Sequence, residues 1–101
     1  MLVLPRELEY VVGMDWGHLE PGCLLWTACL PEHRLHVIRE WKFKETVDED
    51  IASGFLSRTK DLGVHVRYVA ADPSMWIRDG RNAHRGQSRA ETLIRAGMPL
   101  R

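Results

Sequence analysis

The chain of 101 residues is long enough for one small domain, and 45% of its residues are hydrophobic and 28% charged. This composition is typical of a folded protein and excludes an intrinsically disordered chain. The formal net charge is zero, so the total charge gives no indication of a nucleic-acid partner. No apolar stretch is long enough to cross a membrane, and the N-terminus lacks the order of a signal peptide, so we expect a cytoplasmic protein.

The first half of the chain predicts an antiparallel meander. Residues 1–8 read as a linker or an incomplete strand, and residues 9–101 as the domain itself. Strands are predicted over residues 9–15, 23–30 and 34–43, joined by short turns rich in proline and glycine. Both faces of the strand over residues 23–30 are apolar, so we expect it to be central and covered on both sides.

Within the third predicted strand, apolar and polar residues alternate. Leu35, Val37, Trp41 and Phe43 fall on one side of this alternation, which predicts that they share a buried face. Glu40 falls in the polar set, where a solvated or ion-paired glutamate is the ordinary expectation, with a role as an outer metal ligand as the alternative.

A helix is predicted to follow the meander. Thr46 and Glu49 have the spacing of a capping box, and Gly63 stands where a helix commonly ends in a left-handed residue. A strand over residues 64–71 comes next. Because the intervening helix permits a parallel crossover, we expect this strand to lie beside the strand over residues 9–15.

The last third of the chain predicts one more helix. Ser88 and Glu91 form a second capping box, and Gly97 marks the end of the helix. Residues 98–100 then read as the entry to a further strand, so that a fifth strand and a last helix are missing from the fold.

The two cysteines are not predicted to form a disulfide. Cys23 and Cys29 lie in one predicted strand, which puts their Cα atoms roughly 20 Å apart at the usual rise per residue. They read as small hydrophobic residues of a reducing compartment.

The candidate catalytic residues are two aspartates at strand ends. Asp15 closes the first predicted strand, and Asp72 closes the fourth. If those strands are parallel neighbours, both carboxylates leave the sheet at one edge, where their repulsion favours a bound divalent cation. Each has a structural alternative, since Asp15 can bond the backbone of the turn after it and Asp72 can cap a short helix that begins with proline.

Basic residues gather toward the C-terminus. Six arginines stand between residues 78 and 101, against only Asp79 and Glu91. Arg78, Arg81 and Arg85 are therefore candidates for contact with DNA phosphates, with a solvated arginine-rich surface as the alternative. Trp76, just ahead of them, is a candidate substrate contact, and His18 is a further residue that can approach Asp15 from the loop.

The order and spacing of five segments resemble a known family. They are residues 12–17 (Val-Gly-Met-Asp-Trp-Gly), 21–22 (Pro-Gly), 35–40 (Leu-His-Val-Ile-Arg-Glu), 71–76 (Ala-Asp-Pro-Ser-Met-Trp) and 86–91 (Gly-Gln-Ser-Arg-Ala-Glu). Together they resemble the C-terminal nuclease domain of bacteriophage terminase large subunits. The resemblance implies a ribonuclease H-like α/β fold and covers the chain from about residue 9.

The resemblance also implies a function. It implies an endonuclease that cuts double-stranded viral DNA during packaging, with two Mg²⁺ or Mn²⁺ ions held by acids that match Asp15 and Asp72. One ion would activate water and the other would stabilise the leaving oxygen. The family's third acidic ligand has no counterpart here, and neither has the packaging ATPase domain, so we expect a partial domain that is weakly active or inactive alone. Other packaging proteins are implied as partners, and a second copy is a further candidate through an exposed sheet edge.

Two other classes of function stay open. The first is a non-catalytic DNA-binding or assembly module that keeps the fold without the chemistry. The second is half of a sugar-kinase or actin-like nucleotide-binding fold, which also begins with an Asp-x-Gly turn. That family places serine or threonine after the glycine, whereas Gly17 here is followed by His18 and Leu19.

Overall fold

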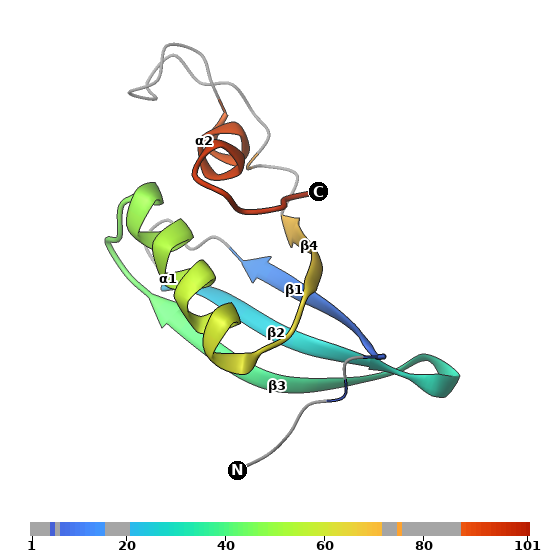
Figure 1. Cartoon of the computed structure of the whole chain (residues 1–101). Coiled ribbons are helices and arrows are strands. Elements are labelled where there is room, and N and C mark those ends of the chain that lie inside the picture. Colours follow the sequence, from blue (N-terminus) through green and yellow to red (C-terminus); the bar gives the residue numbers. More distant parts are fainter. Residues whose placement is uncertain (1–4, 6, 16–20, 72–74, 76–87) are drawn as a thin grey trace.

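Four strands and two α-helices make up the computed structural model, which describes residues 5, 7–15, 21–71, 75 and 88–101 (Figure 1). In chain order the elements are β1 (Glu9–Asp15), β2 (Gly22–Leu30), the 3₁₀ turn η1 (Pro31–His33), β3 (Arg34–Phe43), α1 (Asp48–Leu62), β4 (Val66–Ala71) and α2 (Arg89–Arg95). The predicted strands are all present. β2 begins one residue earlier than predicted, and β4 begins two residues later.

The strands form one mixed sheet in the order β3-β2-β1-β4. β1 pairs with β2, and β2 with β3, in antiparallel fashion, whereas β4 runs parallel to β1. The helix α1 makes the crossover from β3 to β4 that the parallel pairing requires. This topology confirms the predicted α/β architecture and is consistent with a ribonuclease H-like fold.

Both helices pack on the same face of the sheet, where they build one core. Leu24 and Trp26 of β2 are fully buried there, together with Ile51 of α1 and Leu93 of α2. The Trp26 ring stacks on Phe55 at 6.0 Å between ring centroids, and its Nε1–H donates to the Thr59 hydroxyl at 2.9 Å. The buried indole thus has its donor satisfied while its ring fixes α1 over the centre of the sheet.

The opposite face of the sheet is only partly buried. Along β2 the burial alternates strictly, with Leu24, Trp26 and Ala28 buried and Leu25 and Thr27 half-exposed. The expectation that β2 is covered on both sides is therefore wrong for the part of the chain that the structure describes. The apolar residues of β2 on the face away from the helices predict a covering layer, but neither α1 nor α2 lies on that face.

A β-bulge in β3 changes which of its residues face the core. Trp26 pairs with Arg39 but the next residue, Thr27, pairs with Val37, so Ile38 is an extra residue in the strand. Because an inserted residue reverses the alternation beyond it, Val37 lies on the opposite face from Trp41. The prediction that Leu35 and Val37 share the buried face of Trp41 and Phe43 is wrong: they are 71% and 53% exposed.

The helix ends follow the sequence signals in part. Gly63 takes the left-handed conformation at φ 70° and its N–H donates to the Thr59 and Lys60 carbonyls, as predicted. The Ser88 hydroxyl accepts from the Glu91 N–H at 3.1 Å and caps α2. The capping box at Thr46 is wrong, because Val47 is the N-cap residue of α1 and the Thr46 hydroxyl donates to the Lys44 carbonyl instead.

The last residues of the chain pair with β4 at the edge of the sheet, where a fifth strand would lie. After Gly97, at φ 107°, Leu100 forms a parallel bridge with Val69 of β4. The Val69 N–H donates to the Pro99 carbonyl and the Arg101 N–H to the Val69 carbonyl, each at 2.8 Å. The predicted strand entry is thus confirmed, and it covers part of the outer edge of β4.

Candidate functional site

The parallel pairing of β1 and β4 brings two chain positions together at their carboxyl ends. Gly13 pairs with Ala70, and Met14 pairs with Ala71, which places the residues just before Asp15 and Asp72 side by side. Asp15 is the last residue of β1 and is exposed. Asp72 lies outside the described residues. The backbone therefore meets the main condition of the predicted two-aspartate site, namely that the strands carrying it are parallel neighbours.

Register defines the immediate surroundings of Asp15. Asp15 pairs with Cys23 of β2, and Cys23 pairs with Lys42 of β3. Directly opposed residues project from the same face of an antiparallel pair, so this row crosses three strands on one face. Because Met14 is buried in the core under the helices, Asp15 and its row belong to the partly exposed face.

Charge on this face acts on the Cys23 thiol. Burial raises the pKa of Cys23 from its ordinary value of 9.0, and the negative charges of Glu40 and Asp15 raise it further, whereas Lys42 lowers it. Glu40 itself pairs with Lys42 at 3.5 Å between Oε1 and Nζ. The corner of the sheet next to Asp15 thus holds two carboxylates, one ammonium group and a neutral thiol.

Glu40 was expected to be solvated or ion-paired, with a role as an outer metal ligand as the alternative. It is exposed and ion-paired, as the sequence indicated. It also lies on the same face as Cys23, close enough to influence the pKa of the thiol across the strands. Among the described residues, however, no group of three or more histidines, cysteines or acids is arranged to hold a metal ion.

Other predicted site residues lie beyond what the structure describes. These are Asp72, Trp76, Arg78, Arg81, Arg85 and His18. Sequence reasoning missed Cys23 and Lys42 as neighbours of Asp15. The antiparallel register of β1, β2 and β3 carries that information, and a strand pattern read one strand at a time does not contain it.

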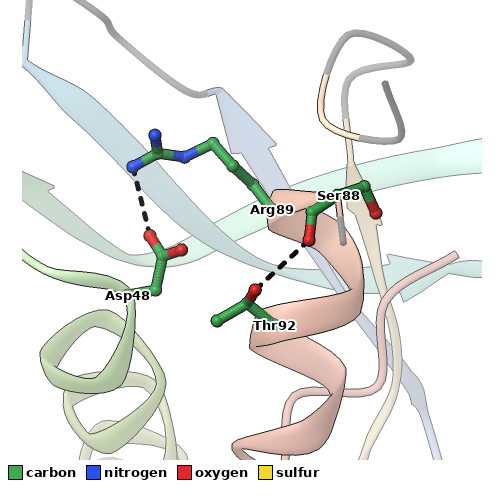
Figure 2. Close-up of polar contacts among 4 residues, drawn as sticks. All are labelled: Asp48, Ser88, Arg89 and Thr92. Carbon is green, nitrogen blue, oxygen red and sulfur yellow. Dashed lines mark hydrogen bonds and ion pairs between the residues drawn. The ribbon is translucent and has the colours of Figure 1, made fainter. Parts of the chain in front are cut away.

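A second polar cluster joins the first turns of the two helices (Figure 2). Asp48, the first residue of α1, accepts from Arg89, the first residue of α2, at 3.2 Å. The Thr92 hydroxyl donates to the Ser88 carbonyl at 3.3 Å within α2. The Asp48 side chain is 15% exposed and that of Arg89 35%, so this ion pair is partly shielded from water and links the start of α2 to α1.

Comparison with solved structures relates this architecture to a viral protein. The fold is similar to the large terminase from a thermophilic bacteriophage, crystal form 3, with a TM-score of 0.67 and 18% identity over 100% of this chain. Crystal form 2 of that protein gives a TM-score of 0.65 at 18% identity over 99% of this chain. Its complex with ADP gives 0.62 at 16% identity over 100% of this chain.

The likeness establishes a terminase-like fold. The chain spans 24% of the length of each of these terminase structures. No protein-family model and no curated protein sequence matches the chain. No helix within the described residues is long and apolar enough to cross a membrane.

Proposed function

We propose that the chain is a terminase-like DNA endonuclease domain that hydrolyses the phosphodiester backbone of double-stranded DNA during viral packaging in the cytoplasm of a bacterial host. One observation carries the proposal. The pairing of Met14 with Ala71 sets the positions that precede Asp15 and Asp72 side by side on parallel strands. Two acids from adjacent strand ends are a common source of oxygen ligands for hard divalent cations.

Asp15 and Asp72 are the proposed ligands for two Mg²⁺ or Mn²⁺ ions. When bound, such a pair of ions supplies an activated water and stabilises the leaving oxygen. Asp15 is exposed at the end of its strand, so its carboxylate is open to an ion and to a large substrate. Only these two acids are proposed as ligands, which is why we expect this domain to be weakly active on its own.

Substrate binding is assigned to basic residues outside the ligand pair. Arg78, Arg81 and Arg85 follow Asp72 in the sequence, so they are the proposed contacts with DNA phosphates. Lys42 carries positive charge on the same sheet face as Asp15. Other packaging proteins are the proposed partners of the assembled enzyme, and a second copy is a further proposed partner through the part of the β4 edge that residues 99–101 leave unpaired.

The nuclease proposal predicts Mn²⁺-dependent nicking of supercoiled plasmid that requires Asp15. Asp15→Asn keeps the shape of the side chain but removes its charge. We expect it to lower nicking by more than about 100-fold, beyond the 10–100-fold typical of groups that only support a ligand. The matched control is Asp61→Asn, in the last turn of α1. It is exposed and lies near the start of β4, at the opposite end of the sheet from Asp15.

The outcomes separate the proposal from its competitor. Equal nicking by wild type and Asp15→Asn would contradict a catalytic Asp15. The second candidate function is a non-catalytic DNA-binding or assembly module that keeps the fold without the chemistry. It predicts no nicking by any variant together with duplex binding that is the same with Mn²⁺ and with EDTA.

A further inference from the structure

The hairpin end of β3 carries a row of basic side chains on the helix-bearing face of the sheet. Arg34 pairs with Leu30, His36 with Ala28, and Arg39 with Trp26, and Ala28 and Trp26 are buried on that face. Opposed residues share a face, so the three basic residues project to the side on which α1 packs. Arg34 and His36 are exposed and Arg39 is half-exposed.

The helix α1 leaves this row uncovered. It packs over the Phe43 end of β3, and the hairpin of β2 and β3 projects beyond it (Figure 1). The first four residues of β3 are all exposed, whereas Phe43 at its other end is buried. The basic row therefore occupies the part of the strand that faces solvent.

Arg58 of α1 extends the row toward the other end of β3. Its guanidinium carbon lies 3.9 Å from the centroid of the Trp41 ring, and its Nη1 donates to the Gly54 carbonyl at 3.2 Å. Trp41 is on the same face as Arg39, two residues further along the strand. Stacking orders the guanidinium, and the Gly54 contact uses one of its five N–H donors.

The row carries a net positive charge. Lys42 pairs with Glu40, Arg67 with Glu9 and Arg89 with Asp48, and none of these ion pairs involves Arg34, Arg39 or Arg58. Glu40 of β3 pairs with Leu25 and lies on the opposite face. Asp61 is the acid that α1 contributes near its C-terminal end, and it forms no ion pair with these arginines.

We infer that Arg34, His36, Arg39 and Arg58 form a second phosphate-contact surface for double-stranded DNA, in addition to the proposed contacts of Arg78, Arg81 and Arg85. From Arg34 to Arg39 the strand spans about 16 Å, and duplex DNA carries one negative charge per about 1.7 Å of its axis, so several phosphates can meet the row at once. Guanidinium groups match phosphate oxygens in pairs. The choice of DNA over another polyanion rests on the proposed function.

The test is equilibrium binding to a fluorescent duplex of about 25 base pairs in EDTA, from about 50 to about 200 mM salt. The variant is Arg34→Gln with Arg39→Gln. The matched control, Lys44→Gln with Lys60→Gln, removes the same charge from two exposed positions outside the row. We expect about tenfold weaker binding by the arginine variant at the lowest salt, and a salt slope smaller by about two, since each lost phosphate contact lowers it by about 0.9.

Three results would overturn the inference. The first is equal loss in both double variants, because net charge alone would then explain binding. The second is wild-type binding by the arginine variant, checked as folded by its thermal melt. The third is competition by a polyglutamate peptide that equals competition by unlabelled duplex DNA, which would indicate an acidic protein partner. Because EDTA removes divalent ions, the binding assay does not depend on metal-ion catalysis. The nuclease proposal is tested separately, by metal-dependent nicking.

Discussion

Asp15 has a defined neighbour across the sheet on β2. Here it pairs with Cys23, whose thiol pKa is raised by burial first, and then by Glu40 and Asp15. The thiol therefore reports on the charge state of Asp15, which gives the residue a readout independent of any catalytic activity.

Asp15→Asn is predicted to make Cys23 more reactive. Removing the negative charge lowers the pKa of the thiol, so more thiolate is present at a given pH below that pKa and alkylation speeds up. We expect a rise of about two- to threefold at mildly alkaline pH, measured by iodoacetamide labelling in a Cys29→Ser background. Asp61→Asn is the control. An unchanged rate in Asp15→Asn would show that Asp15 points away from Cys23.

The pH dependence of this labelling has a defined sign. Because the folded-state pKa of Cys23 lies above its ordinary 9.0, the folded protein favours the neutral thiol. The contribution of the neutral Cys23 thiol to the stability of the fold is complete below the pKa of Cys23 in the unfolded chain. It is lost as the pH rises through the pKa of Cys23 in the folded protein. Labelling of the folded protein should therefore rise with pH later than labelling of the urea-unfolded chain.

At the scale of elements, the contact between α1 and β3 depends on a glycine within a helix. Gly54 stands in the middle of α1, where glycine ordinarily costs stability relative to alanine. A Cβ at this position would overlap the Trp41 ring, which Arg58 covers from the same helix. The glycine therefore lets the helix approach β3 closely enough for the indole to fill the space between them.

Gly54→Ala is predicted to destabilise the fold, against the usual sign of this substitution in a helix. Overpacking costs about 1–3 kcal/mol, and we expect this site to lie in the upper part of that range, which outweighs the gain of about 1 kcal/mol in helix propensity. Urea unfolding followed by circular dichroism measures it. Ser53→Ala, at the exposed neighbouring position, should raise stability slightly. A stabilised Gly54→Ala would show that α1 does not sit against Trp41.

Signals within single segments predicted much of the fold. The ends of β1 and β3, the left-handed Gly63 and the Ser88 cap were each readable because the residues that determine them are close in sequence. The bulge at Ile38 could not be predicted in this way. It leaves no signal in the residue composition of the strand, and its effect is to move Leu35 and Val37 to the other face of the sheet. The Thr46 cap failed because its hydroxyl has a nearer backbone acceptor in Lys44.

Site prediction had the same limit. Asp15 was predicted as a candidate from its position at a strand end, but its neighbours Cys23 and Lys42 come from two other strands and follow only from the register. Arg34 and Arg39 were not singled out either. The bulge puts them on the same face although they are an odd number of residues apart, so simple alternation separates them.

At the scale of the whole molecule, the sheet has one covered face and one partly exposed face. Both helices and the core lie on the first, and Asp15 with its row of neighbours lies on the second. On the outer edge of β4, residues 99–101 already supply backbone partners for Val69 and Ala71. The nuclease proposal depends on the carboxyl ends of β1 and β4, where the two strand-end aspartates are expected.

The most direct test of that proposal is calorimetric titration with Mn²⁺ of the wild-type chain, Asp15→Asn, Asp72→Asn and the control Asp61→Asn. If the parallel pairing of β1 and β4 builds one metal site, wild type and the control bind Mn²⁺ and either strand-end substitution abolishes binding. Binding that persists in both Asp15→Asn and Asp72→Asn, or no binding by the wild-type chain, would contradict the account.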